Sequence, residues 1–224
     1  TNKIKRSDYP FPAKTHNSIT NKIKNDAYRQ ALSYHKKSTE TFFDPVCGVG
    51  VLCQLMEDEL PQANIQGCDY HQGVVDFAKK KLKRSKLISG DVMTWLNTLP
   101  SNKTAVFELF DVGLIGEGLL HLLPSLRENS KLLPLSATIN AQLVEARFTS
   151  LNEVDLTACN TYRWEQSYTT AKHKDWKPVT DPVEIGVIDF ATATPEKHDF
   201  GKFEMKITNN GVASAVIFWF VLDL

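Results

Sequence analysis

The sequence has no apolar run long enough to cross a membrane, and its start, Thr1 to Arg6, lacks the apolar stretch of a secretory signal. It also has no excess charge of either sign, because 26 lysines and arginines balance 26 aspartates and glutamates. Such a chain has no general attraction for nucleic acid or an anionic membrane. We therefore predict a soluble, cytoplasmic protein without direct nucleic-acid binding, which attracts any cationic substrate locally.

Cysteine is scarce, and the four cysteines are Cys47, Cys53, Cys68 and Cys159, with no C-x-x-C pair. Neither these residues nor the six histidines follow the spacing of a zinc site, so we predict no metal. We interpret the cysteines as reduced, buried thiols. Cys47 lies in a glycine-rich turn, where reactivity is an alternative to packing.

Apolar periodicity predicts a helix and then βαβ units in the first half of the chain. Ile19, Ile23, Ala27 and Ala31 recur every four residues, which predicts an N-terminal capping helix with one buried stripe. Further helices are predicted near 51–56 and at 71–83, and the basic run at 79–84 is expected to favour the helix dipole and to face solvent. Strands are predicted at 41–44, 64–69, 86–89 and 105–110.

The second half of the chain is predicted to be rich in strands. After a helix around 119–128, apolar residues alternate with polar ones from Ala137 to Leu143, and Asn209-Asn210-Gly211 predicts a hairpin between 203–207 and the apolar run 215–220. The fold class expected is α/β, a Rossmann-like parallel sheet with helices on both faces, followed by an antiparallel sheet or partial β-barrel. We place the two domains at residues 1–132 and 133–224, because Leu133-Pro134 breaks the helical pattern.

A glycine-rich turn, Asp44 to Gly50, joins the first predicted strand to a helix. Such a turn lets the backbone approach a ligand and offers free N–H groups, although it also occurs for packing reasons alone. Asp69 ends the next strand, where it is placed to bind ribose hydroxyls. Asp91 follows the third strand and could meet an adenine amino group or cap a helix. Together these residues indicate a nucleoside-containing cofactor.

Two acids, Glu108 and Glu117, stand at the ends of a glycine-studded stretch, and Glu108 lies near the carboxyl end of the fourth predicted strand. Crowded carboxylates raise each other's pKa unless a cation lies between them. A planar guanidinium fits because it can donate paired hydrogen bonds to each acid. The two acids therefore indicate an arginine site, and the alternative is a pair of solvated loop residues.

These residues resemble known families. The stretch Asp44 to Gly50 resembles the first motif of class I S-adenosylmethionine-dependent methyltransferases, and Asp69 resembles their ribose-binding acid. The stretch Glu108 to Gly118 resembles the double-glutamate loop of the protein arginine methyltransferases, including the spacing of its acids. Continued through 137–145 and the last apolar strand, the resemblance is strongest to the monomethylating, type III branch.

The resemblance implies an enzyme that transfers a methyl group from S-adenosyl-L-methionine to an arginine-containing protein or peptide. Glu108 and Glu117 would hold the guanidinium. Gly48 and Gly50, in the motif that begins at Asp44, would carry the amino acid end of the cofactor, and Asp69 and Asp91 would bind its ribose and adenine. Lys24 stands where the family has an arginine that grips the cofactor's carboxylate.

The sequence departs from the family pattern in three places. Val46 replaces a motif glycine, Lys24 replaces the arginine, and the family's His-Trp loop does not appear before Leu224. We therefore expect a fragment or an abbreviated member, whose last strand is covered by further residues or by a second copy in a homodimer. The alternatives are a non-catalytic interaction domain of methyltransferase shape and a small-molecule methyltransferase.

Overall fold

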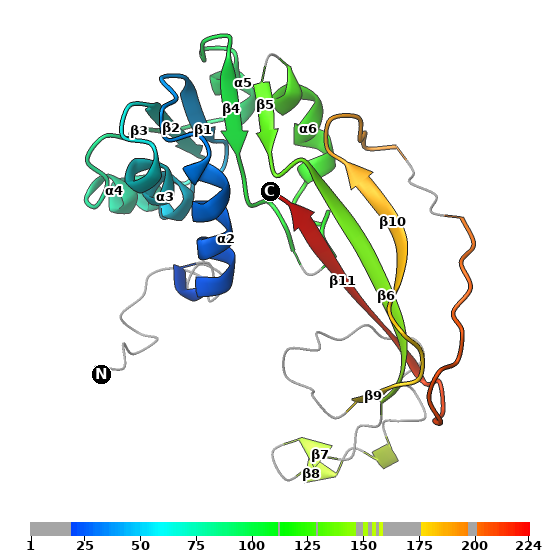
Figure 1. Ribbon diagram of the computed structural model, residues 1–224. Coiled ribbons are helices and arrows are strands. Elements are labelled where there is room, and N and C mark those ends of the chain that lie inside the picture. Colours follow the sequence, from blue (N-terminus) through cyan, green and yellow to red (C-terminus); the bar gives the residue numbers. More distant parts are fainter. Residues whose placement is uncertain are drawn as a thin grey trace.

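A computed structural model describes residues 19–111, 113–128, 130–146, 150–151, 154–155, 157–158, 176–196 and 201–224. The first half is a five-stranded parallel sheet in the order β3-β2-β1-β4-β5 (Figure 1). Its strands are β1 (Thr41–Asp44), β2 (Asn64–Asp69), β3 (Lys86–Ser89), β4 (Lys103–Val106) and β5 (Ser130–Leu133). The predicted bounds of β1, β2 and β3 are confirmed. β4 ends earlier than predicted, and β5 has no counterpart in the prediction.

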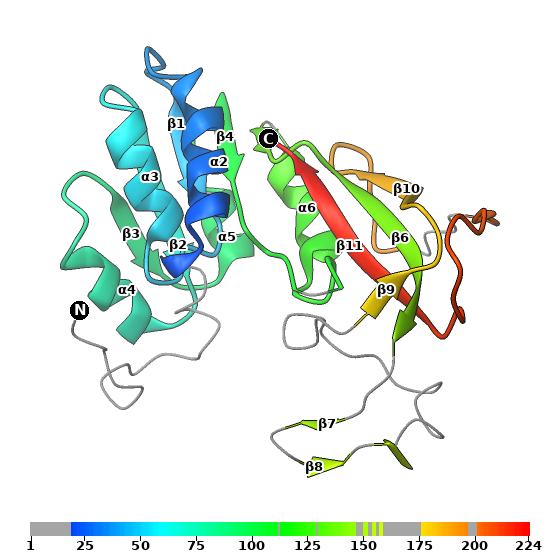
Figure 2. The same ribbon diagram turned by 60° about the horizontal axis from the view of Figure 1, so that its bottom comes forward.

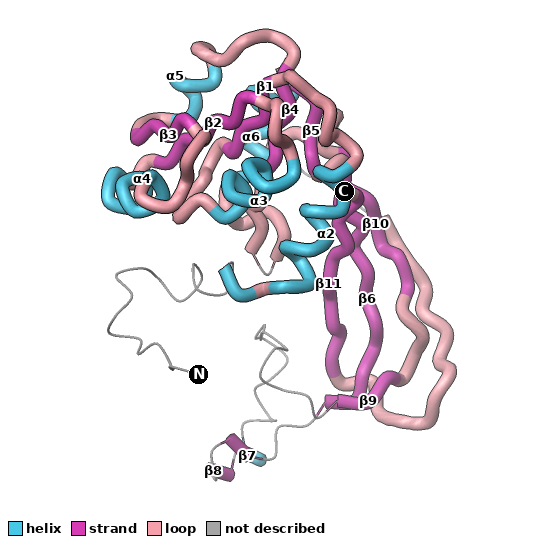
Figure 3. The backbone as a smooth tube through the Cα atoms, turned by 60° about the vertical axis from the view of Figure 1, so that its left-hand side comes forward, coloured by secondary structure: helices cyan, strands magenta, loops and turns pink. Residues whose placement is uncertain are grey.

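Helices cover both faces of this sheet, as predicted (Figure 3). One face carries α2 (Lys22–Ser33), α3 (Val51–Glu59) and α4 (Gln72–Lys79), and the other carries α5 (Val92–Leu96) and α6 (Leu119–Arg127). Successive side chains of a strand point to opposite faces. Phe42 therefore packs into the core with α2 and α3, whereas Phe43 packs into the core with α5 and α6.

The buried stripe of α2 agrees with the predicted one at Ala31 and differs from it at Ile23. Ile23 is 86% exposed, while Tyr28, Ala31 and Leu32 are buried. The reason is geometric, because a four-residue repeat drifts by about 40° per step on a helix of 3.6 residues per turn. The helix instead turns its bulkier side chains to the sheet, where the Tyr28 hydroxyl donates a 2.7 Å hydrogen bond to the Phe107 carbonyl.

The second half forms an antiparallel sheet in the order β10-β6-β11, with β9 also paired to β6. The strands are β6 (Ser136–Ala146), β9 (Trp176–Pro178), β10 (Val183–Asp189) and β11 (Ala215–Asp223), and a separate pair comprises β7 (Ser150–Leu151) and β8 (Val154–Asp155). Figure 2 shows this sheet beside α6. Ile188 and Phe190 pack into the same core as α5 and α6. The predicted antiparallel sheet is confirmed.

The predicted hairpin around Asn210 is wrong. β11 pairs with β6 along its whole length, and Ile207 makes only an isolated bridge with Thr180. The turn is tied to β6 instead, because Glu145 Oε2 accepts a hydrogen bond from the Val212 N–H at 3.2 Å. The long-range partner β6 offers far more pairing than the short local strand.

The change from parallel to antiparallel pairing falls between Leu133, at the end of β5, and Ser136, at the start of β6. The division into domains at residues 132 and 133 stays a prediction. Among the described residues, no helix is long and apolar enough to cross a membrane.

Arg84 belongs to the basic run that was predicted to face solvent, but it has a structural role. Its guanidinium donates to four main-chain oxygens that follow and end α3, those of Glu57, Leu60, Pro61 and Ala63, at 2.7 to 3.4 Å. In return, the Glu57 carboxylate accepts the N–H groups of Lys83, Arg84 and Ser85. Arg84 and Glu57 therefore join the end of α3 to the segment that enters β3.

We expect Arg84→Ala to lower the free energy of unfolding by about 1–2 kcal/mol, because hydrogen bonds from a charged donor are lost while the carbonyls keep some access to water. Urea unfolding followed by circular dichroism measures this change. Arg29→Ala is the matched control, since the contact of Arg29 within the described part of the chain is an exposed ion pair with Asp26, worth about 0.5 kcal/mol or less. Equal losses in both variants would contradict the structural role of Arg84.

Candidate functional site

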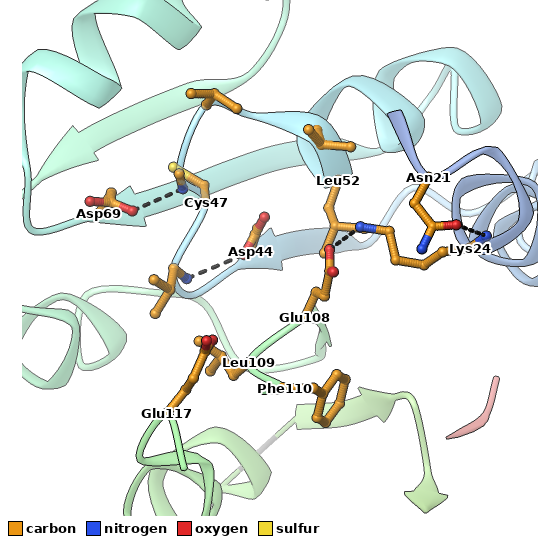
Figure 4. A pocket seen from close by; sticks show the side chains of 14 residues that line it. Asn21, Lys24, Asp44, Cys47, Leu52, Asp69, Glu108, Leu109, Phe110 and Glu117 are labelled. Atoms are coloured by element: carbon orange, nitrogen blue, oxygen red, sulfur yellow. Dashed lines mark hydrogen bonds and ion pairs between the residues drawn. The ribbon is translucent and has the colours of Figure 1, made fainter. Parts of the chain in front are cut away.

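A cavity of about 370 Å³ lies at the carboxyl ends of β1, β2 and β4 (Figure 4). From β1 the chain adds β2 and then β3 on one side of the sheet, and it later adds β4 and then β5 on the other side of β1. The cavity therefore lies at the point where the strand order reverses, which is where open α/β sheets bind ligands. Six of the predicted site residues line it, namely Lys24, Asp44, Gly48, Asp69, Glu108 and Glu117. The fold thus brings together residues that lie up to 93 positions apart, the span from 24 to 117.

The turn after β1 is held by side-chain acceptors at both ends. Asp44 Oδ1 accepts the Val46 N–H at 3.2 Å, and Asp69 Oδ2 accepts the Gly48 N–H at 2.9 Å. Gly48 has a φ of +48°, and a Cβ at this position would meet no atom within 4 Å. The turn therefore presents an open backbone surface at Gly48.

Gly50 has a packing role. It is the N-cap of α3 with a φ of +82°, and a Cβ there would lie 2.8 Å from Leu82 Cδ1 and 3.2 Å from Ala78 Cβ. Unlike Gly48, Gly50 is not among the described residues that line the cavity. Its glycine allows α3 to begin close against the α4 region. A contact between Gly50 and a cofactor stays a prediction.

Asp91 is the N-cap of α5 and is not among the described lining residues either. Its Oδ1 accepts the Thr94 N–H at 2.8 Å and the Thr94 hydroxyl at 3.0 Å. These hydrogen bonds hold the pKa of the Asp91 carboxyl below its ordinary value. The helix-capping alternative is what the structure shows, and adenine recognition by Asp91 stays a prediction.

Asp44 is a buried carboxyl beside the cavity, only 3% exposed. Burial raises its pKa to about 8; the Val46 N–H opposes this rise, and the charges of Glu108 and Asp69 add to it. The group is therefore mostly protonated at neutral pH. A cation in the cavity would favour its ionised form.

Lys24 reaches the cavity from the first turn of α2, where its N–H is capped by Asn21 at 3.1 Å. Its ammonium group forms an ion pair with the Glu108 carboxylate (Figure 4). The side chains are 16% and 26% exposed, so the pair is partly shielded from water. In this structure Lys24 thus neutralises one of the two acids predicted to hold a guanidinium.

We call the stretch from Glu108 to Glu117 the acid loop. Glu117 lies at its far end, just before α6 begins at Leu119, and lines the same cavity as Glu108. Together with Asp44 and Asp69 the cavity has four carboxyl groups. Among its described lining residues, Lys24 alone carries a positive charge. Because Asp44 is mostly protonated and Lys24 neutralises Glu108, Asp69 and Glu117 give the wall its net negative charge, which favours cationic ligands.

Among the lining residues that were not predicted as site residues are Asn21 and Phe110. Asn21 precedes α2, and Phe110 lies within the acid loop. The Phe110 ring stacks on Phe190 at 5.9 Å and an interplanar angle of 21°, and it also meets Phe220 at 5.9 Å. The antiparallel sheet therefore supports the acid loop through aromatic contacts, and only the position of Phe110 between the two acids could have indicated it.

Val46, which departs from the methyltransferase motif, lines the cavity and is 42% exposed. Its side chain is accommodated at the rim rather than in the core. The turn keeps its hydrogen bond from the Val46 N–H to Asp44.

Comparison with solved structures identifies the fold. No protein-family model matches the chain, and no curated protein matches it. Among solved structures, the chain is similar to the PRMT1 enzyme–prozyme heterotetrameric complex of Trypanosoma brucei with AdoHcy, at 14% identity and a TM-score of 0.62, over 93% of this chain and 72% of that one. It also matches a SAM-dependent methyltransferase from Archaeoglobus fulgidus, at 19% identity and a TM-score of 0.40, over 61% of this chain and 59% of that one. The chain has the fold of the S-adenosylmethionine-dependent methyltransferases.

Proposed function

We propose that this protein transfers a methyl group from S-adenosylmethionine to the guanidinium of an arginine in a protein or peptide. The observation that carries the proposal is that Glu108 and Glu117, from the two ends of one loop, line the same cavity as Asp44, Gly48 and Asp69. The acid pair and the turn proposed to bind the nucleoside thus line one cavity.

The residues present fit the cofactor. The open surface at Gly48 offers room for the amino acid end, and Lys24 offers a positive charge for its carboxylate. Each carboxylate oxygen has two lone pairs. Asp69 can therefore accept ribose hydroxyls while it keeps its hydrogen bonds from the N–H groups of Gly48 and His71. A cavity of about 370 Å³ is within the usual range for small-molecule sites.

The acid pair suits a guanidinium nucleophile. Bound at Gly48 and Asp69, the cofactor supplies an electrophilic methyl group on a sulfonium. Glu108 and Glu117 would each accept charge-assisted hydrogen bonds from the guanidinium and fix one nitrogen on the line of attack. Their negative charge draws positive charge to the nitrogens they hold, which leaves the lone pair of the third nitrogen more available. The methyl group would pass from the cofactor's sulfur to this third nitrogen, and the methylated guanidinium would release one proton to water.

Two finer assignments are supported, one by the sequence resemblance and one by the edge of the antiparallel sheet. The type III likeness of the stretch from Glu108 to Gly118 supports the addition of a single methyl group. The exposed outer edge of β11, with Phe218 59% exposed, supports assembly with a second copy.

A non-catalytic interaction domain is the second candidate. The Lys24 ammonium is paired with the Glu108 carboxylate, which a substrate guanidinium would need as its own partner. Isothermal titration calorimetry of the full chain with S-adenosylmethionine separates the two candidates. We expect saturable binding with a stoichiometry of one, since the turn and Asp69 present the cofactor's contacts. Absence of binding by a folded chain would reject the methyltransferase and support the non-catalytic domain.

A further inference from the structure

Asp111 lies within the acid loop between Glu108 and Glu117. Its Oδ1 accepts a hydrogen bond from the Gly116 N–H at 3.1 Å. Its main-chain oxygen accepts a second one from the Leu114 N–H at 3.1 Å. One residue thus folds the loop back on itself through both its side chain and its backbone.

Gly116 is fitted to the Asp111 side chain. A Cβ at Gly116 would lie 2.1 Å from Asp111 Oδ2 and 2.8 Å from its Cγ, so no larger residue fits while Asp111 keeps its place. The φ of Gly116 is outside the left-handed region, unlike that of Gly118. The backbone conformation itself would therefore accept alanine, and the glycine is needed for the contact with Asp111.

Leu114 anchors the middle of the same loop. Its side chain is 2% exposed and belongs to the core beside α6, although its φ of +74° is unfavourable for a residue with a Cβ. The core therefore fixes Leu114, and the Asp111 carboxylate fixes Gly116, which directly precedes Glu117. The second contact leads straight to an acid of the cavity.

We propose that Asp111 is the positioning residue of the guanidinium site. By holding the backbone of Gly116, it sets where Glu117 stands relative to Glu108. This inference rests on the proposed function, because it assigns Asp111 a role in arginine transfer. Asp111 acts through Glu117, and the cofactor contacts on β1 and β2 do not depend on it.

The test is the steady-state kinetics of the full chain with an arginine-containing peptide. We expect Asp111→Ala to lower kcat/KM about 100-fold, the cost of a displacement of about 1 Å in a catalytic group. The calorimetric Kd for S-adenosylmethionine should stay within about twofold, because Lys24, Gly48 and Asp69 are untouched. Asp111→Asn should keep kcat/KM within about threefold, since its amide oxygen can still accept the Gly116 N–H.

Gly116→Ala provides a second route to the same displacement. It should match Asp111→Ala in activity, and the double variant should be no worse than either single one, because the clash needs the Asp111 carboxylate. Glu145→Ala is the matched control, because Glu145 Oε2 accepts the Val212 N–H at 3.2 Å and neither residue is among the described residues that line the cavity; this variant should leave kcat/KM unchanged.

The outcomes are distinct. If the wild type transfers methyl groups to arginine and Asp111→Ala does so at the same rate, the positioning role alone is rejected. If the wild type folds and binds the cofactor but does not transfer a methyl group to arginine, the proposed function and this inference are rejected together. If Asp111→Ala does not fold, Asp111→Asn and Gly116→Ala decide. If Asp111→Asn lost as much activity as Gly116→Ala, the hydrogen bond from the Gly116 N–H to the Asp111 side chain would not be what positions Glu117.

Discussion

Glu117→Gln is expected to lower kcat/KM for an arginine peptide by about 100-fold or more while the enzyme still binds its cofactor. Glutamine keeps the size and shape of the side chain but removes the negative charge that holds the guanidinium, and loss of one such electrostatic partner typically costs 100- to 1,000-fold. Transfer of labelled methyl from S-adenosylmethionine measures the rate, and calorimetry measures the binding.

Glu108→Gln is expected to reduce transfer to a similar extent and to change cofactor affinity as well, because it also removes the partner of the Lys24 ammonium. Glu184→Gln on β10 is the matched control, since this exposed glutamate is not among the described residues that line the cavity, and its activity should stay within about twofold of wild type. Full turnover in both cavity variants would reject the guanidinium clamp and favour a small-molecule methyl acceptor.

The affinity for S-adenosylmethionine is expected to rise with pH up to about 8 and then to level off. Burial raises the pKa of Asp44 to about 8, so this carboxyl is protonated below that pH in the free protein. A sulfonium in the cavity would lower that pKa, and binding would therefore release a proton. Between the lowered pKa and about 8 the affinity rises at most tenfold per pH unit.

Calorimetry from pH 6 to pH 9, in buffers of different ionisation enthalpy, measures both the slope and the number of protons released. Asp44→Asn should flatten the slope, because its amide oxygen can still accept the Val46 N–H but cannot titrate. S-adenosylhomocysteine, which lacks the sulfonium charge, should show a smaller slope than S-adenosylmethionine. The neighbouring Lys24, Asp69 and Glu108 are present in both proteins, so an equal slope in wild type and Asp44→Asn would assign the proton to another group.

The local parts of the fold could be predicted from the sequence because they depend on nearby residues. Alternating apolar runs gave the bounds of β1, β2 and β3, and the glycine turn and Asp69 fell at strand ends where the structure places the cavity. The parallel sheet follows from this alternation. The same alternation placed Glu108 near the carboxyl end of the fourth strand, and in the structure Glu108 lies just beyond β4.

The misses come from long-range packing. The hairpin signal at Asn210 was outweighed by pairing of β11 with β6, whose paired residues lie 71 to 87 positions earlier in the chain. The stacking of Phe110 on Phe190 joins the two halves of the protein, and no local pattern indicates it. The Lys24–Glu108 ion pair likewise depends on how α2 docks against the sheet.

Asp91 and Gly50 show a different limit. Asp91 is an N-cap, and an aspartate is favoured both at an N-cap and in a ligand contact. Gly50 lies at the start of a helix, where a glycine is favoured both for close packing and for the approach of a ligand. The structure displays the local roles. Sequence alone cannot separate the two roles, because each satisfies the same pattern.

The most direct test of the central claim is tandem mass spectrometry of an arginine-containing peptide after incubation with the full chain and methyl-labelled S-adenosylmethionine. We expect the label on a guanidinium nitrogen of arginine, and we expect a peptide with lysine in place of arginine to stay unlabelled. A chain that is folded and binds the cofactor but leaves arginine unlabelled would contradict the proposed arginine transfer.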